Sequence, residues 1–119
     1  MIIMVKQIYN KNSIEKTLQK RFLKNFMDLL ILVEISRTPL ISGYDIIVAF
    51  QRKFNLFISP GTVYSTLYRL ERDGLIRGEE RKRKRVYILT SKGEEFVRRI
   101  SILQENFNFI LSKILVKAR

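Results

Sequence analysis

Residues 59–93 constrain the fold most, because signals for one helix and two strands follow each other there without a gap. Ser59 and Pro60 predict a helix start, since serine is a favoured N-cap residue and proline at the first helical position already has a helical φ. Gly74 predicts the end of that helix. Two short strands, residues 75–78 and 85–89, follow. A capped helix that leads into a basic hairpin is typical of a winged helix-turn-helix, a mostly α fold with a small β-hairpin.

The preceding sequence supplies the other helices of such a fold. A helix is expected from residue 12 or 13 to just before Pro39, because the residue ahead of proline avoids the α region. Leu56 and Ile58, in a short connection, are expected to point inward. One face of the first helix carries apolar residues four apart, namely Ile14, Leu18, Phe22, Phe26 and Leu30.

Two further helix starts have the spacing of a capping box. Ser42 and Asp45 predict a helix that ends near residue 54, and Ser91 and Glu94 predict a last helix that runs almost to the C-terminus. The length of 119 residues suits one domain with a modest core. We therefore divide the chain into an N-terminal arm (1–12), a winged helix-turn-helix domain (13–90) and a C-terminal dimerisation helix (91–119).

The charge of the chain limits its partners. The sequence has 23 basic and 11 acidic residues, a net charge of +12. Such an excess indicates a polyanionic partner, either nucleic acid or an anionic membrane surface. The apolar run at residues 26–35 is about half the ~20 residues that a bilayer span needs, and the N-terminal apolar run stops at Lys6, too soon for a signal peptide. We expect no membrane partner.

The residue types that are missing also exclude chemistry. The chain has no cysteine and no histidine, so it lacks thiol nucleophiles, imidazole acid–base groups and the usual zinc ligands. It contains no glycine-rich phosphate loop, and its acidic residues stand among basic ones as surface pairs. We expect no enzyme activity, no metal and no cofactor, and the absence of disulfides favours a cytoplasmic location.

The helix predicted at residues 60–73 separates into two faces. Val63, Leu67 and Leu70 form the inward stripe, so the opposite face is polar and begins with small residues that permit close approach to a major groove. Its hydroxyl and guanidinium groups suit base edges and phosphates. The alternative is an ordinary amphipathic helix with a solvated face. The candidate contacts on the exposed face are Ser65, Tyr68, Arg69 and Arg72, with Thr62 and Tyr64 beside them.

The predicted turn between the strands is strongly basic. Five adjacent cations repel one another unless a counter-charge is present. At the tip of a hairpin they can contact phosphates or enter a narrow minor groove; the alternative is a loop that only increases solubility. The five residues are Arg81, Lys82, Arg83, Lys84 and Arg85, within a wing expected at residues 77–87.

The last helix carries a heptad stripe with intervals of 4, 3, 4, 3 and 4 residues. A small winged domain cannot cover such a helix along its whole length. A second copy of the chain would bury the stripe and give a homodimer suited to a palindrome, although heptads also pack within monomers. The stripe consists of Phe96, Ile100, Leu103, Phe107, Ile110 and Ile114.

Residues 59–76, S-P-G-T-V-Y-S-T-L-Y-R-L-E-R-D-G-L-I, together with P-L-I-S-G-Y-D-I at 39–46 and Y-I-L-T-S-K-G at 87–93, resemble the PadR-like family of winged-helix transcriptional regulators. The resemblance covers roughly residues 26–100. It implies a cytoplasmic homodimer, usually a repressor, that binds double-stranded DNA and dimerises through its C-terminal helix. The single C-terminal helix indicates the short subgroup.

By position, the resemblance implies supporting backbone contacts from Ser42 and Tyr44 and adds Ser59 to the recognition helix. It also implies wing contacts that extend from residue 83 to Tyr87. This chain departs from the pattern in its longer N-terminal arm and in a wing tip that has more basic residues and no glycine.

Many members of the family respond to small aromatic molecules. The phenylalanines that either line such an effector pocket or fill the core and interface are Phe22, Phe26, Phe96, Phe107 and Phe109.

Two other classes of function fit the sequence. One is a protein-interaction module built on a winged helix, which the charge of the wing disfavours. The other is a DNA-organising or RNA-binding protein without sequence preference, which the tyrosine- and serine-bearing helix face disfavours.

Overall fold

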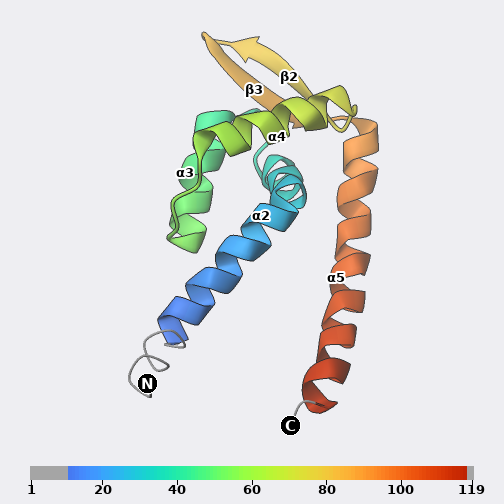
Figure 1. Ribbon diagram of the computed structural model, residues 1–119. Coiled ribbons are helices and arrows are strands. Elements are labelled where there is room, and N and C mark those ends of the chain that lie inside the picture. The colour runs from blue at the N-terminus through green and yellow to red at the C-terminus, as the bar shows by residue number, and fades with distance from the viewer. Residues whose placement is uncertain (1–10, 118–119) are drawn as a thin grey trace.

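The computed structural model describes residues 11–117. Of the predicted arm at 1–12, residues 1–10 therefore lie outside the described residues. In Figure 1, α4 and the hairpin lie together at one end of the molecule, and α2 and α5 extend away from them toward the two termini. The elements are α2 (Lys11–Arg37), β1 (Ile41–Ser42), α3 (Gly43–Phe54), α4 (Pro60–Arg72), β2 (Ile76–Arg81), β3 (Lys84–Leu89) and α5 (Ser91–Lys117).

The three strands form one antiparallel sheet in the order β1-β3-β2. The hairpin of β2 and β3 is longer than the sequence predicted, because its pairing continues to Arg81 and Lys84 beside the turn. On the other edge of β3, Ile41 of β1 pairs with Tyr87. The two-residue strand β1 was not predicted, since two residues carry no periodic signal.

The position of β3 in the middle of the sheet changes its burial. Successive side chains of a strand point to opposite faces of its sheet, yet Val86 and its neighbour Tyr87 are both buried. A central strand has protein on both edges, and here α2, α3 and α5 also contact it. Leu40, with φ 67°, turns the chain into β1 and donates its N–H to the Tyr87 carbonyl at 2.9 Å.

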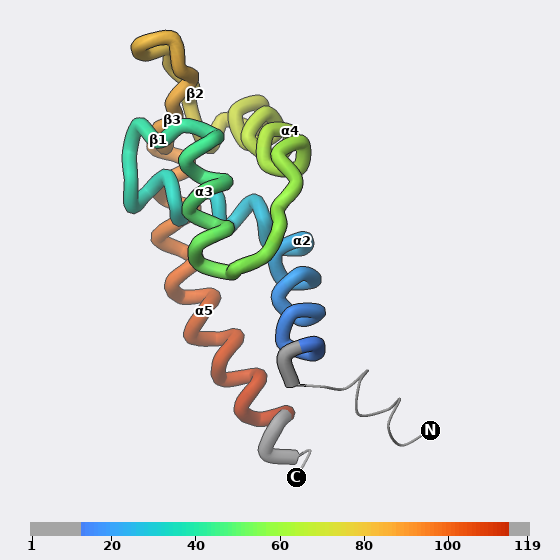
Figure 2. The backbone as a smooth tube through the Cα atoms, turned by 90° about the vertical axis from the view of Figure 1, so that its left-hand side faces the viewer, coloured from blue at the N-terminus to red at the C-terminus, as the bar shows by residue number. Residues whose placement is uncertain are grey.

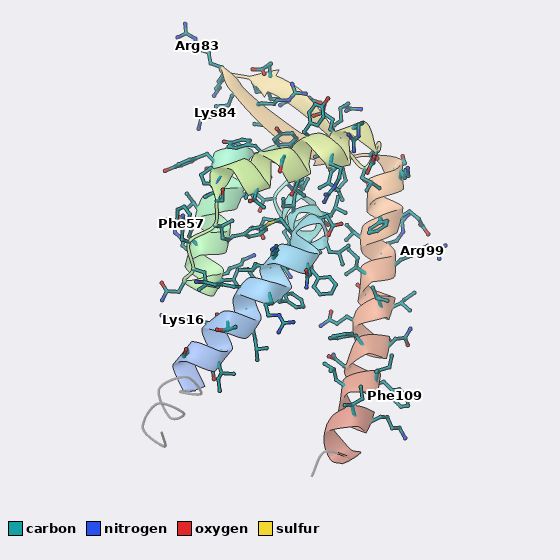
Figure 3. All side chains as sticks on the ribbon, viewed as in Figure 1. Lys16, Phe57, Arg83, Lys84, Arg99 and Phe109 are labelled. Carbon is teal, nitrogen blue, oxygen red and sulfur yellow. The ribbon has the colours of Figure 1, made fainter. Side chains whose placement is uncertain are left out.

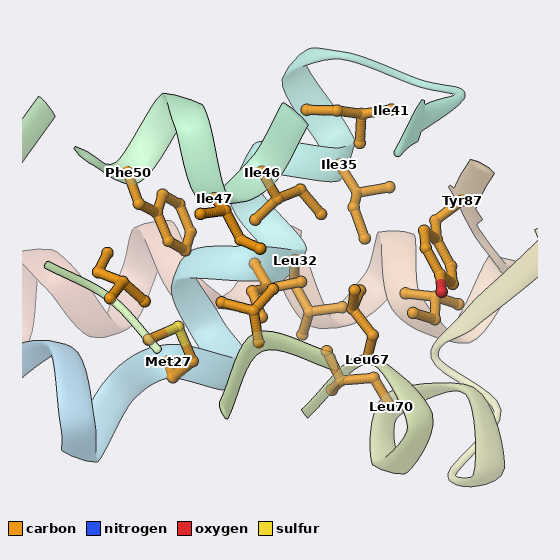
Figure 4. Packing of buried hydrophobic residues seen from close by; sticks show 14 of the residues in the cluster. Met27, Leu32, Ile35, Ile41, Ile46, Ile47, Phe50, Leu67, Leu70 and Tyr87 are labelled. Carbon is orange, nitrogen blue, oxygen red and sulfur yellow. The ribbon is translucent and has the colours of Figure 1, made fainter. Parts of the chain in front are cut away.

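The core lies where α2, α3 and α4 meet the sheet (Figure 4). The predicted inward residues of the connection before α4, Leu56 and Ile58, are confirmed as buried. Glu34 of α2 is also buried, and its carboxylate pairs with Lys53 of α3 at 2.6 Å, which satisfies the charge. The largest fully buried side chains are Phe50, Ile31, Leu32, Ile35, Ile46, Leu67, Ile76 and Val63.

The helix α2 bends at Phe26, whose backbone angles are φ −119° and ψ 21°. After the bend, Met27, Ile31, Leu32 and Ile35 are buried in the core, whereas most of the first half of the helix extends from the domain (Figure 2). Leu18 and Phe22, on the face that the sequence pattern selected, are therefore 57% and 45% exposed. The pattern predicted a helix correctly but did not identify which of its faces is buried.

The ends of α3 and α4 agree with the sequence signals in most respects. The Ser42 hydroxyl accepts from the Asp45 N–H at 3.1 Å, and Gly74 is left-handed with φ 79°. After α4 the Leu75 N–H donates to the Leu70 carbonyl at 3.0 Å, as in a Schellman motif. Ser59 occupies the N-cap position of α4, but its side chain makes no capping hydrogen bond; its carbonyl accepts from the helix instead.

The start of α5 differs from the prediction by one residue. Thr90, not Ser91, is the cap: its hydroxyl oxygen accepts from the Gly93 N–H at 3.1 Å and donates to the Gly74 carbonyl at 2.6 Å. A Cβ on Gly93 would lie 2.0 Å from the Leu75 carbonyl oxygen, so only glycine fits. The first turn of α5 is thereby fixed against the end of α4.

None of the helices within residues 11–117 is long and apolar enough to cross a membrane.

Candidate nucleic-acid interface

The two faces of α4 are those that its sequence predicts. Val63, Leu67 and Leu70 are buried against the core, and Tyr68 on the opposite side is 69% exposed. The helix is held by its apolar side, so its polar side is presented to solvent in a fixed orientation. The predicted contacts that lie exposed on or beside α4 are Ser59, Thr62, Tyr64, Ser65, Tyr68, Arg69 and Arg72.

The Ser65 hydroxyl already has a partner within the helix. It donates to the Thr62 carbonyl at 3.1 Å, and the Thr66 hydroxyl donates to the same carbonyl at 2.7 Å. A hydroxyl that donates in this way keeps its oxygen free as an acceptor. The Ser65 oxygen therefore remains available to accept a hydrogen bond.

The wing, residues 77–87, projects beyond the rest of the domain (Figure 3). Its two-residue turn consists of Lys82 and Arg83, with φ of 50° and 66°. Positive φ at both central positions is required by the type I′ turn and favours asparagine and glycine. Side chains other than glycine lose roughly 1–2 kcal/mol each in this region. Lys82 and Arg83 therefore occupy left-handed turn positions that favour glycine or asparagine.

The five basic residues of the wing fall into two groups. Arg81 pairs with Glu79 at 3.2 Å, and Arg85 pairs with Glu71 of α4 at 2.7 Å. Within residues 11–117, Lys82, Arg83 and Lys84 have no ion-pair partner. We call these three residues the wing tip; they are the cations that remain available to an external anion.

Two adjoining clefts separate the wing from the helices. The larger, about 520 Å³, lies between α4 and the wing, and its walls include Tyr64, Tyr68 and Arg85. The smaller, about 250 Å³, continues past Tyr64 to Tyr44 and Lys84. The fold thus brings together predicted contact residues from α3, α4 and the wing.

Two of the predicted residues lie beneath this surface. Ser42 is buried and caps α3, and Tyr87 is buried within the hydrophobic core. Burial raises the pKa of the Tyr87 phenol above its ordinary value of 10.0, and the neighbouring Arg85 opposes that rise. Both residues support the exposed side chains around them.

Sequence reasoning did not identify three residues that shape the site. A Cβ on Gly43 would lie 2.5 Å from the Tyr64 ring, so glycine lets that ring pack on the start of α3. Gly78 and Glu71 both contact the Arg85 guanidinium. Glu71 and Arg85 are 14 residues apart, and only the packing of the hairpin on α4 brings them together.

The heptad stripe of α5 is largely uncovered, as predicted for a single copy of the chain. Leu103 and Ile114 are each 57% exposed. An apolar groove of about 500 Å³ separates α5 from α2. The aromatic rings of Phe22 and Phe26 on its α2 side are 4.8 Å apart, and Phe107 lies on its α5 side; Phe96 and Phe109 do not line it.

Among residues 11–117, no group of three or more acidic side chains is arranged to hold a metal ion.

An amphipathic helix with an exposed polar face, followed by a β-hairpin with a basic tip, defines a winged helix-turn-helix protein. The profile of the transcriptional regulator PadR-like family matches residues 31–99, more than half of the chain. The chain belongs to the PadR-like family of transcriptional regulators. A comparison with curated protein sequences gives no significant match.

Solved structures of PadR-like proteins share this fold. A PadR-like transcription factor from Bacteroides fragilis is 24% identical, with a TM-score of 0.67 over 82% of this chain and 98% of that chain. A regulator from Bacillus cereus is 23% identical, with a TM-score of 0.72 over 80% and 96%. PadR of Bacillus subtilis, solved in complex with operator DNA, is 24% identical, with a TM-score of 0.56 over 64% of this chain and 45% of that chain.

Proposed function

We propose that the protein is a homodimeric, cytoplasmic repressor that binds a specific sequence in double-stranded DNA. The observation that carries the proposal is the combination of the exposed polar face of α4 with the wing tip, whose cations lack ion-pair partners within residues 11–117. Figure 3 shows Arg83 and Lys84 at the far end of the wing, beyond α4. The operator complex of Bacillus subtilis PadR supports DNA as the partner.

In this proposal α4 enters the major groove. A helix of 13 residues is about 20 Å long, and a major groove of about 12 Å width admits it. Tyr68 and Arg69 on its exposed face contact base edges, and Ser65 accepts from a base amino group. Arginine is well suited to guanine, whose two major-groove acceptors it can contact with two parallel hydrogen bonds.

The wing tip supplies affinity without strong sequence preference. Lys82, Arg83 and Lys84 contact the phosphates or the minor groove beside the helix site. Neutralising phosphates releases counterions, so the affinity falls as salt rises, with a log–log slope of about −0.9 per phosphate neutralised. If a dimer neutralises about 8 phosphates, the slope is near −7.

The heptad stripe of α5 pairs with a second copy of the chain. Its residues are exposed in the single chain, and water would otherwise cover several large apolar side chains along the helix. A dimer places two α4 helices about one DNA turn apart, roughly 34 Å, which matches a palindromic operator. The proposed units are thus the winged domain (13–90) and the dimerisation helix (91–119). We assign a small aromatic effector, the further partner that the family resemblance implies, to the apolar groove between α2 and α5.

The decisive experiment selects bound sequences from random duplexes at low and moderate salt. We expect one symmetric site to be enriched at both salt concentrations. Tight, salt-sensitive binding without an enriched sequence would replace the proposal with a DNA-organising role. An absence of binding under both conditions would reject both functions and leave the protein-interaction module. A promoter–reporter assay with the enriched site then distinguishes repression from activation.

A further inference from the structure

Arg85 lies in the run of five basic residues, but its surroundings differ from those of the wing tip. Its Nη2 atom is 2.7 Å from Oε2 of Glu71, in the last turns of α4, and its Nη1 atom is 3.8 Å from Glu80. The Arg85 guanidinium therefore points back across β2 toward the helix. Its positive charge is therefore already paired with the carboxylates of Glu71 and Glu80.

Gly78 makes this path possible. A Cβ at this position would lie 2.6 Å from Arg85 Nη2 and 2.7 Å from its Cζ, so the guanidinium rests on the bare backbone of β2. The same Glu71 oxygen also faces the Gly78 N–H at 3.4 Å. One carboxylate of α4 thus contacts both strands of the hairpin.

We infer that Arg85 is a positioning residue, which acts through Glu71 to hold the wing at a fixed distance and angle from α4. The inference rests on the proposed function, because it concerns how two DNA-contacting surfaces engage one site at the same time. The Arg85 and Glu71 side chains are 45% and 31% exposed, and a pair this exposed adds little to the stability of the whole fold. Its effect is local, on the position of the wing.

Fixing the wing matters because a hairpin that moves must lose that freedom on binding. A wing held in the bound arrangement before binding avoids this loss, and the specific complex gains affinity. Loose, non-specific binding requires only that positive charge lie near phosphates. The contact between Arg85 and Glu71 therefore affects specific affinity, whereas the wing tip affects affinity for all sequences.

The test is Glu71→Gln, because the two roles of Arg85 predict opposite results. If Arg85 positions the wing, this variant binds the selected site roughly 5- to 20-fold more weakly even though its net charge rises by one. Its affinity for unrelated DNA and its salt slope equal those of Asp73→Asn, a variant with the same net charge. If Arg85 contacts phosphate, removing Glu71 frees the guanidinium, and binding to all sequences becomes tighter and more salt-sensitive; that result overturns the inference.

Two further variants control for charge. Asp73→Asn removes the same charge from the same end of α4. Within residues 11–117 the Asp73 carboxylate pairs with its neighbour Arg72, at 3.8 Å, and does not reach the wing; we expect the specific affinity of this variant to equal that of the unaltered protein. Gly78→Ala keeps every charge but displaces the Arg85 guanidinium, and we expect it to weaken specific binding like Glu71→Gln. Unchanged specific affinity in Gly78→Ala, with the fold intact by circular dichroism, would contradict the inference.

A measurement without DNA separates this inference from the proposed function. Backbone relaxation by NMR on the full chain should show lower order parameters for the wing amides in Glu71→Gln and Gly78→Ala, and unchanged values in Asp73→Asn. If the unaltered protein binds no duplex, the proposed function fails, and the order parameters alone decide whether Arg85 fixes the wing. Equal wing order in all four proteins refutes the positioning role.

Discussion

The helices α4 and α5 carry apolar residues at similar helical spacing, yet the structure treats them differently. Val63 of α4 is fully buried, whereas Leu103 of α5 is 57% exposed. The helix α4 packs between α2, α3 and β2, but from residue 101 to 114 every described side chain of α5 is exposed. The apolar face of a helix is stable in water only when another surface covers it. A single copy of this chain covers that face in α4 but leaves most of it exposed in α5.

The largest expected effect breaks the packing of α4. Leu67 is 1% exposed, and Leu67→Ala should lower the free energy of unfolding by about 2–5 kcal/mol, because it removes buried methyl groups and leaves a cavity. Urea unfolding at fixed protein concentration measures the change. The matched control is Ile102→Ala in α5, at a side chain that is 62% exposed, where we expect a change within about 0.5 kcal/mol. Equal losses in both variants would mean that α5 is covered as closely as α4.

The second prediction tests whether the heptad stripe of α5 forms the dimer interface. Leu103→Glu should weaken the dimer roughly 100-fold, since the dimer would have to bury an unpaired carboxylate. Sedimentation velocity should then show monomers at micromolar concentration. Ile102→Glu introduces the same charge one residue away, off the stripe, and should leave the dimer intact. A dimer that persists in Leu103→Glu places the interface elsewhere.

A third prediction extends the comparison to the wing. Changing Lys82, Arg83 and Lys84 to alanine should weaken binding to every duplex by about tenfold or more at moderate salt. With six fewer charges per dimer, the log–log salt slope should become shallower by about 5. Arg69→Ala should instead relax sequence preference and flatten the slope by much less. Fluorescence anisotropy over a salt series distinguishes them, and identical behaviour of the two variants would show that helix and wing do not divide specificity and affinity.

The smallest expected effect concerns the turn itself. Lys82→Asn combined with Arg83→Gly installs the favoured type I′ residues and should raise the free energy of unfolding by about 1 kcal/mol. DNA affinity should fall at the same time, because two tip charges are lost. Thermal unfolding and anisotropy measure the two changes. If the free energy of unfolding does not rise, the left-handed conformations of Lys82 and Arg83 do not strain the turn.

Helix ends and the hairpin were predictable from sequence to within a few residues, because they depend on local chemistry. The capping of α3 by Ser42, the left-handed Gly74 and the burial of Leu56 and Ile58 all follow from neighbouring residues. The cap of α5 was placed one residue late, since Thr90 and Ser91 are both good caps. Sequence alone does not decide between adjacent hydroxyls, whereas the contact of Thr90 with the Gly74 carbonyl does.

The candidate site was only partly predictable. Exposure of the polar face of α4 followed from periodicity, and the basic tip followed from composition. The burial of Tyr87 did not, because it depends on β1, whose Ile41 pairs with Tyr87 from 46 residues earlier in the sequence. The ion pair between Arg85 and Glu71 was also not predictable, since nothing in a run of five adjacent basic residues indicates which of them contacts α4.

A winged helix-turn-helix with a basic tip was predictable from local signals alone, because capping, turn and periodicity signals act over a few residues and agree with one another. The packing of the elements was needed to show which side chains of α2 are buried, where the wing lies relative to α4 and which cations of the wing lack an ion-pair partner within residues 11–117. These properties depend on contacts between residues far apart in the chain. Such contacts form only when the core brings the elements together, so no local sequence pattern predicts them.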